Sequence, residues 1–137
     1  MNILLQVGVK VFLKNKAGKY LLIKRSSLKY PGVKGVWDIV GGRIDPGTGL
    51  IANLRREVKE EVALEIISEP RLVTAQDIIP NPEKHIVRLS YIADTEGEPK
   101  LDMSENIEYR WCTVAEMKVE SDLDAYVREM VEAGLVD

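Results

Sequence analysis

Residues 42–64 read GRIDPGTGLIANLRREVKEEVAL, and another glycine, Gly41, directly precedes them. The stretch contains Glu57, Glu60 and Glu61, whose i, i+3 and i+4 spacing places three carboxylates on one side of a helix. Like charges at this spacing repel each other by roughly 0.2–0.5 kcal/mol per pair. A bound cation relieves that repulsion, and a cation beside a flexible glycine turn favours phosphate chemistry.

The segment from Thr48 to Val62 is predicted to form a helix, because its apolar residues recur at helical spacing. These residues are Ile51, Leu54, Val58 and Val62. With Glu57 set at about 0° on a helical wheel, the apolar stripe covers about 60–140°, while Glu61 lies at about 40° and Glu60 at about 300°. The glutamates border the buried stripe, so we expect them at the floor or wall of a cleft.

Strand patterns flank this helix on both sides. The odd positions from Ile3 to Leu13 are all apolar, which predicts a long strand, and a turn over 15–18 leads to a hairpin partner over 20–25. Further strands are predicted over 37–40, 71–79, 85–93 and 108–113. A second helix is expected to run to about Ala133, with Ser121 or Asp122 as its cap and Gly134 as its stop.

Strands and helices in this order, without regular βαβ alternation, predict an α+β fold with a mixed sheet between helices. A chain of 137 residues is long enough for one domain with a sizeable core, so we expect a single domain over residues 1–137. No internal repeat or low-complexity stretch interrupts it.

Composition excludes several classes of function. The net charge of −3 argues against a binder of duplex nucleic acid, which usually carries a basic surplus. Cys112 is the single cysteine, so no internal disulfide forms, and we expect it to be a small core residue. No apolar run reaches the ~20 residues of a membrane span, and the N-terminus lacks the features of a signal peptide. A cytoplasmic location without membrane contact is therefore expected.

The stretch quoted above resembles the Nudix box. That pattern is Gly, five residues, Glu, seven residues, then Arg-Glu-U-x-Glu-Glu-x-Gly-U, where U is aliphatic. Seven of its nine specified positions match here: Gly42, Arg56, Glu57, Val58, Glu60, Glu61 and Leu64. Trp-Asp-Ile-Val-Gly-Gly before the box and Glu-Tyr-Arg-Trp near the end extend the similarity over roughly residues 7–117.

The resemblance implies a Nudix-type α/β/α sandwich and a hydrolase that cleaves a pyrophosphate bond with the help of Mg²⁺ or Mn²⁺. Such hard cations take oxygen ligands and share the phosphates of the substrate. The implied metal ligands are Glu57, Glu60 and Glu61, joined by the backbone carbonyl of Gly41. In isolation three solvated helix glutamates would be the simpler interpretation, but the box around them favours metal binding.

Two positions depart from the box: Thr48 stands in place of Glu, and Ala63 in place of Gly. The family uses the arginine of the box structurally, bonded to the missing Glu, so Arg56 needs another partner. We expect Asp45 to replace it, or Thr48 to cap the helix with its hydroxyl. Ala63 in a left-handed helix end costs on the order of 1 kcal/mol. Neither departure removes a metal ligand.

The group that activates the attacking water is open between two candidates, because Nudix enzymes use either a glutamate of the box or one on a later loop. Glu57 is the first candidate and Glu105 the second, with Glu96 and Glu98 as weaker loop alternatives. Arg25, Lys34 and the backbone of Gly42 are expected to contact the phosphates of the substrate. His85 and Trp37 are interpreted as structural residues.

Substrate identity is the least determined point. Pro80, sixteen residues after Leu64, resembles a feature of ADP-ribose pyrophosphatases and slightly favours ADP-ribose or a nucleotide sugar. The alternatives are a nucleoside triphosphate pyrophosphatase, including one that removes oxidised nucleotides, and a nucleotide-binding module with little turnover. A role at RNA ends lacks a basic surface to support it. A small-molecule nucleotide is the expected partner, and a homodimer is compatible with the sequence.

Overall fold

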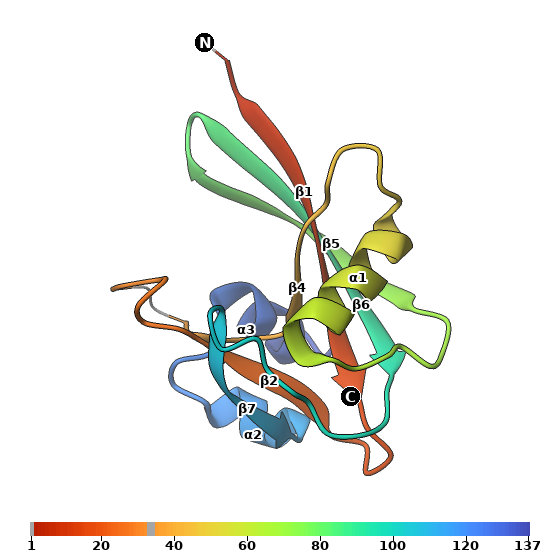
Figure 1. Cartoon of the computed structure of the whole chain (residues 1–137). Helices are drawn as coiled ribbons and strands as arrows, with labels where there is room; N and C mark the ends of the chain where they lie inside the picture. Colours follow the sequence, from red (N-terminus) through yellow and green to blue (C-terminus); the bar gives the residue numbers. More distant parts are fainter. Residues whose placement is uncertain (1, 33–34) are drawn as a thin grey trace.

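The computed structural model describes residues 2–32 and 35–137 (Figure 1). The elements in chain order are β1 (Leu4–Lys14), β2 (Tyr20–Arg25), β3 (Trp37–Asp38), β4 (Val40–Arg43), α1 (Leu50–Val62), β5 (Arg71–Asn81), β6 (Lys84–Asp94), β7 (Asn106–Cys112), α2 (Val114–Val119) and α3 (Ala125–Glu132). No helix in this described part is both long and apolar enough to cross a membrane.

Strand β1 organises the sheet. It pairs in parallel with β6 along its whole length, from Leu4 opposite Lys84 to Lys14 opposite Asp94. Its other side pairs antiparallel with β4 and, at the Lys14 end only, with β2. The strand path is β3-β2-β1-β6-β5, with β4 attached to β1 and β7 to β2. The predicted mixed sheet is therefore confirmed.

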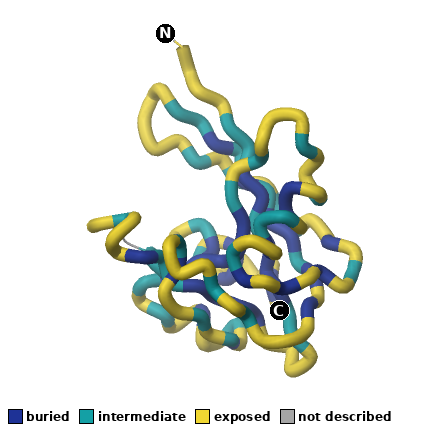
Figure 2. The backbone as a smooth tube through the Cα atoms, viewed as in Figure 1, coloured by how far each residue is buried: buried dark blue, intermediate teal, exposed yellow. Residues whose placement is uncertain are grey.

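Alternation along β1 sends its side chains to two cores, one on each face of the sheet. Val9, Val11 and Leu13 belong to the core that α1 covers, whereas Phe12 belongs to the core that α3 covers. Buried residues concentrate where the sheet passes between the helices (Figure 2). The predicted placement of the sheet between helices is confirmed.

Helix α1 follows the predicted apolar stripe but begins later than expected. Leu54, Val58 and Val62 are fully buried, and burial of each such side chain contributes about 1.5–3 kcal/mol. The N-cap is Gly49, which has no side-chain cap hydrogen bond, so the predicted cap by Thr48 is wrong. Thr48 instead closes the preceding turn, because its backbone N–H donates to the Asp45 carbonyl.

The C-terminus of α1 has the left-handed shape that the family pattern implies, although no glycine is present. Ala63 has a φ of 56°, and its N–H donates to the Lys59 carbonyl at 3.1 Å. The reversal turns the chain so that Leu64 and Ile66 join the core under α1. Packing of these two residues holds Ala63 in a conformation that costs an L-residue about 1 kcal/mol or more.

Strand β2 spans the predicted residues, and its predicted hairpin pairing with β1 is confirmed only at the end next to the turn. Only Tyr20 pairs with β1, at Lys14, whereas β2 pairs with β7 from Tyr20 opposite Cys112 to Arg25 opposite Asn106. Period-2 alternation predicts a strand without naming its neighbour, and here β1 pairs with β4 and β6 instead.

The C-terminal region contains two helices where one was predicted. Helix α3 begins at Ala125 with Asp124 as its N-cap, so the prediction of Ser121 or Asp122 as the cap is wrong. Helix α2 was missed, although Thr113 and Glu116 form a reciprocal capping box at its start. That Thr-x-x-Glu pattern is the sequence signal that would have found it. Gly134, at a φ of 74°, ends α3 as predicted.

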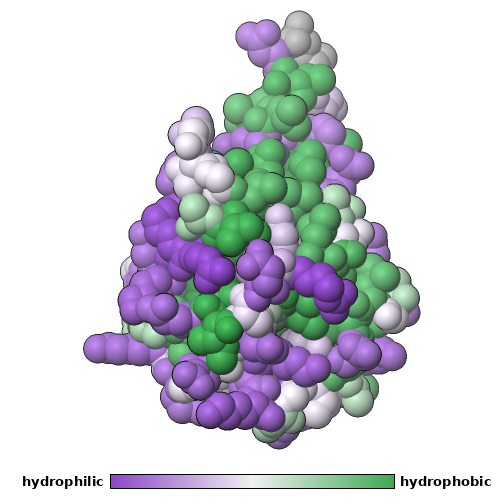
Figure 3. Space-filling view, turned by 90° about the vertical axis from the view of Figure 1, so that its right-hand side faces the viewer, coloured by the Kyte–Doolittle hydropathy of each residue, from purple (hydrophilic) through white to green (hydrophobic). Residues whose placement is uncertain are grey.

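The first residues of β1 and the adjoining ends of β5 and β6 form an arm that projects from the body (Figure 1). Ile3, Leu4, Leu5 and Ile79 are more than half exposed there. Hydrophobic surface gathers along this part of the molecule (Figure 3). At the base of the arm the sheet is half-buried, and the candidate active site begins there.

Replacing Ala63 with glycine should stabilise the fold. Glycine adopts the left-handed conformation without a Cβ clash, so Ala63→Gly should raise the free energy of unfolding by about 1 kcal/mol. Ala52→Gly, on the exposed side of α1, is the matched control and should lower it by about 1 kcal/mol. Urea unfolding measures both, and a loss of stability in A63G would contradict the proposed role of the cap.

Candidate active site

Gly41 and Gly42 lie inside β4, paired with Lys10 and Val9 of β1, so the predicted glycine turn is wrong, and the glutamates of α1 approach a strand. Gly41 has a φ of 145°, and a Cβ placed on it would lie 2.0 Å from the Val9 carbonyl oxygen, so only glycine fits. Its N–H donates to Oε2 of Glu61 at 3.1 Å. A Cβ on Gly42 would lie 3.0 Å from both carboxylate oxygens of Glu57. Gly41 thus lets β4 lie close to β1, and Gly42 lets the carboxylate of Glu57 approach the backbone closely.

The three glutamates occupy different environments. The side chain of Glu57 is 17% exposed, whereas that of Glu60 is 58% exposed and pairs with Arg56 at 3.0 Å. Glu57 and Glu61 lie beside the glycines of β4, close enough to interact with each other electrostatically. Within residues 2–32 and 35–137, no three acidic, histidine or cysteine side chains converge closely enough to hold a metal ion. The structure therefore brings two of the predicted ligands together and leaves Glu60 at the rim.

The electrostatics of this pair fit a divalent cation. Burial raises the pKa of Glu61 to about 8, partly opposed by Lys10. Burial also raises the pKa of Glu57, against the lowering effect of Arg56. Without a cation, Glu61 would therefore hold a proton near neutral pH. Two adjacent, desolvated carboxylates form a set of hard oxygen donors, which suits Mg²⁺ or Mn²⁺.

Arg56 braces the loop between β4 and α1. Its guanidinium donates to Asp45 at 2.9 Å and to Oδ1 of Asn53 at 3.0 Å. Asn53 is fully buried and accepts from the backbone N–H of Asp45 at 3.1 Å. Asp45 thus supplies the partner that the sequence departure at Thr48 removes, as predicted.

A cavity of about 260 Å³ opens beside Gly42 of β4. The residues that line it are Gly8, Lys10, Arg25, Asp38, Gly42, Arg43, Ile78, Ile86 and Arg88. Gly42, which touches Glu57, forms one wall, and the apolar side chains of β5 and β6 form another. The cavity therefore extends from Gly42, the neighbour of Glu57, toward Ile78 and Ile86 of β5 and β6.

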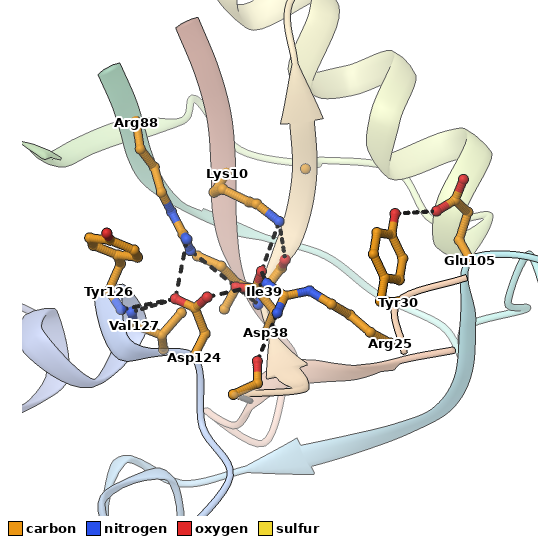
Figure 4. Close-up of polar contacts among 12 residues, drawn as sticks. Lys10, Arg25, Tyr30, Asp38, Ile39, Arg88, Glu105, Asp124, Tyr126 and Val127 are labelled. Atoms are coloured by element: carbon orange, nitrogen blue, oxygen red, sulfur yellow. Dashed lines mark hydrogen bonds and ion pairs between the residues drawn. The ribbon is translucent and has the colours of Figure 1, made fainter. Parts of the chain in front are cut away.

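Asp38 is the anchor of the charged side chains in this cavity (Figure 4). It is 2% exposed and accepts from Lys10 and from Arg88, each at 3.0 Å, and also from Arg25. Burial alone would raise the pKa of Asp38, but the three cations hold it well below its usual range. A buried carboxylate of this kind persists only because it is paired.

Asp124 extends the charged network to α3. Its carboxylate accepts the backbone N–H groups of Tyr126 and Val127, which caps the helix. Arg88 and Arg25 each donate to it at 3.2 Å. The two arginines therefore connect Asp38 with Asp124, and through them the sheet with α3 (Figure 4).

Sequence reasoning placed Arg25 at the site but missed Lys10, Asp38, Arg88 and Asp124. The available signal was a charged residue inside an apolar strand, as with Lys10 between Val9 and Val11. Such residues are expensive to bury unless they are paired, so they indicate a polar partner in the fold. Lys34, predicted to bind phosphate, lies outside the described residues.

The structure ties Glu105 to the loop that follows β2. Its carboxylate pairs with Lys29 and accepts from the Tyr30 hydroxyl at 2.9 Å. The weaker candidates are also engaged: Glu98 accepts from Tyr109 and Trp111, and Glu96 pairs with Lys16. Neither Glu105 nor these two line the cavity beside Gly42.

Comparison with known proteins identifies relatives of this fold. The family profile described as NUDIX domain matches residues 4–133. The MutT protein of Methanosarcina mazei is 24% identical, with 97% of this chain and 94% of that chain covered at a TM-score of 0.82. The MutT Nudix hydrolase of Burkholderia pseudomallei is 23% identical, with 94% and 97% covered at a TM-score of 0.78. No curated protein matches the chain.

Removing the charge of Asp38 should destabilise the fold strongly. Asp38→Asn should lower the free energy of unfolding at pH 7 by about 3–5 kcal/mol, because it leaves buried cations without their partner. The exposed Asp94 provides the control: Asp94→Asn should change the free energy of unfolding by less than about 0.5 kcal/mol. Urea unfolding provides the measurement, and equal stability of the two variants would contradict the anchoring role of Asp38.

The difference in free energy of unfolding between wild type and D38N should depend on pH. Because pairing depresses the pKa of Asp38 in the folded protein, its carboxylate stabilises the fold above the unfolded value of about 3.9. That stabilisation is lost as the pH falls below about 4 and through the lower folded value. The stability difference between wild type and D38N should therefore shrink in acid, and a difference that grows would contradict the assignment.

Divalent metal binding should depend on Glu57 and Glu61. Glu57→Gln or Glu61→Gln should weaken Mn²⁺ binding about tenfold or more, because each removes a charged oxygen ligand. Glu60→Gln should have a smaller effect, since Glu60 is exposed and paired with Arg56. Calorimetric titration with Mn²⁺ measures the affinity, with the exposed Glu65→Gln as the control. An effect of E65Q equal to that of E57Q would contradict the site.

Proposed function

This chain belongs to the NUDIX domain family and is a Nudix pyrophosphohydrolase; from that premise we propose that its substrate is a single nucleoside di- or triphosphate. In this proposal the phosphates lie at Gly41 and Gly42 of β4, and the nucleoside occupies the adjoining cavity. The observation that carries the proposal is that one cavity joins the wall at Gly42, next to Glu57, to the apolar wall of β5 and β6.

The size of the cavity supports a compact substrate. Its volume of about 260 Å³ lies at or below the lower end of the roughly 300–1,000 Å³ range of sites for drug-sized ligands. One nucleoside suits such a space, whereas ADP-ribose and nucleotide sugars carry a second large group beyond the pyrophosphate. That second group would have to lie outside the cavity.

Pro80, which favoured ADP-ribose in the sequence, has a structural role away from the cavity. Pro80 is exposed near the end of β5, at the tip of the arm. It does not line the cavity, and a proline suits an edge strand because it needs no ladder hydrogen bond. ADP-ribose therefore remains the alternative that a substrate panel must test, together with oxidised nucleoside triphosphates.

Glu57 and Glu61 are the residues that would hold Mg²⁺ or Mn²⁺, which when bound supplies charge neutralisation for the phosphate oxygens and activates water. The Gly41 N–H fixes Glu61, and Arg56 with Asp45 holds the loop that leads into α1. Lys10 and Arg25 present positive charge to the part of the cavity next to Gly42. These residues orient the substrate, consistent with positioning as the main task in phosphoryl transfer.

We assign Glu57 as the group that accepts the proton of the attacking water. A general base has to reach its proton within hydrogen-bond distance, and the carboxylate of Glu57 lies beside Gly42, which lines the cavity. Glu105 has both carboxylate oxygens engaged by Lys29 and Tyr30, so it would have to leave them first. Its proposed role is to hold the loop after β2.

Catalytic function is favoured over a binding module without turnover. The two departures from the box motivated that alternative, yet Asp45 occupies the place of the missing partner of Arg56. Ala63 adopts the left-handed conformation that a glycine would adopt. Helix α1 therefore presents its glutamates without distortion, and the geometry gives no reason for lost activity.

A substrate panel tests the proposal. With Mg²⁺, we expect at least one nucleoside triphosphate to be hydrolysed with a kcat/KM at least about tenfold above that for ADP-ribose, because only the former fits one cavity. Glu57→Gln should lower kcat on every substrate by about 100-fold or more, while Glu65→Gln should leave it unchanged. Phosphate release measures turnover. Preferential cleavage of ADP-ribose would overturn the substrate assignment.

A further inference from the structure

One edge of β1 is open along the arm. Strand β4 pairs with β1 only from Gly8 onward, and one further hydrogen bond joins the Ile44 N–H to the Val7 carbonyl. The opposite edge of β1 is occupied by β6 along its whole length. In the part of the chain that the structure describes, no strand pairs with residues 3–6 on the β4 side. This segment belongs to the arm that projects from the body (Figure 1).

The backbone groups that face the open edge belong to the odd-numbered residues. In a paired strand, the N–H and C=O of one residue point to the same side, and those of the next residue point to the other side. The Leu4 N–H donates to the Glu83 carbonyl beside β6, whereas the Val7 carbonyl accepts on the β4 side. Ile3 and Leu5 therefore direct their N–H and C=O groups at the open edge, where a further strand would continue the sheet.

The free edge of β5, at the end of the sheet, carries features that discourage pairing. The register between β5 and β6 shifts at two places, and the strand includes Asp77 and Pro80. Bulges, prolines and charges keep natural sheets from pairing edge to edge. Residues 3–6 contain no proline and no charge, and β1 pairs with β6 without a shift of register. The edge of β1 therefore lacks the protection that the edge of β5 has.

The side chains of this open segment are apolar and exposed. Ile3, Leu4 and Leu5 are 59%, 54% and 62% exposed, and hydrophobic surface gathers over this end of the molecule (Figure 3). An identical segment would meet them with apolar side chains of its own and without charge repulsion. A second copy of β1 therefore complements this edge in both its backbone groups and its side chains.

The position of Ile44 limits the register of two such segments. Because Ile44 lies beside Val7, a second antiparallel β1 has to end its pairing at Gln6. The two-fold arrangement that meets this limit places Leu4 opposite Leu4 of the second copy and Ile3 opposite Leu5. Ile3 and Leu5 have edge-facing backbone groups, so each of these pairs exchanges two hydrogen bonds, while the two Leu4 side chains come closest to each other.

We propose that the chain forms a two-fold homodimer in which residues 3–6 of two copies pair antiparallel about Leu4 and join the two sheets. Both copies use the same segment, so the two open edges cover each other and the assembly closes at two chains. A contact of this length lies at the low end of interface sizes, below about 1,200 Å² in total, so the dimer is weak and depends on concentration. The inference is independent of the proposed function.

Sedimentation equilibrium of the full chain tests the pairing. Between about 10 μM and about 1 mM, the average mass should rise from that of one chain toward that of two. Leu5→Pro removes an N–H that faces the open edge and leaves the pairing with β6 intact, so it should weaken association at least about tenfold. Leu5→Ala keeps the N–H and is the matched control, which should weaken association less than Leu5→Pro does.

A charge exchange at Leu4 tests the register. Leu4→Lys or Leu4→Glu places like charges opposite each other in the dimer, so each variant alone should associate at least about tenfold more weakly than wild type. An equimolar mixture of L4K and L4E brings opposite charges together and should associate more tightly than either variant alone. Leu72, exposed on β5, is the matched control: L72K, L72E and their mixture should associate as wild type does.

Each outcome decides the proposal. A wild-type chain that stays monomeric at every concentration overturns it, as does an average mass beyond that of two chains. Unchanged association in a folded L5P, or no gain on mixing L4K with L4E, overturns the edge pairing. Circular dichroism checks the fold of each variant, and if L5P does not fold, the mixture decides alone.

Discussion

The buried carboxylate of Asp38, held by Lys10, Arg25 and Arg88, is the interaction on which the site depends. The three cations come from β1, β2 and β6, and two of them continue to Asp124 at the start of α3. Because a buried charge has to keep its partners, one network fixes the sheet relative to α3. Four members of this network, Lys10, Arg25, Asp38 and Arg88, line the same cavity as Gly42, the neighbour of Glu57.

The sequence predicted the features that depend on local spacing. The apolar stripe placed α1, the alternation placed β1, and the order of burial of the glutamates followed the helical wheel. Glu61, nearest to the stripe, is the most buried of the three, Glu57 is intermediate, and Glu60, farthest from it, is 58% exposed. The i, i+4 spacing of Arg56 and Glu60 also allowed the ion pair that the structure contains.

Features that depend on distant strand pairing were not predictable in the same way. Arg88 reaches Asp38 across 50 positions of sequence, and that contact exists only because β1 and β6 pair in parallel with Gly8 opposite Arg88. A period-2 pattern specifies which residues share a face and leaves open which strand lies alongside. The pairing of β2 with β7 and the network around Asp38 were missed for the same reason, whereas α2 carried a local signal in Thr113 and Glu116.

The central claim is that one site joins the metal carboxylates to the cavity that holds the nucleoside. The most direct measurement is a crystal structure with Mg²⁺ and a non-hydrolysable nucleoside triphosphate. The account predicts density for the base against Ile78 and Ile86, and for the phosphates at Gly42 with the metal ion on Glu57 and Glu61. A base bound outside this cavity, or a metal ion away from both glutamates, would contradict it.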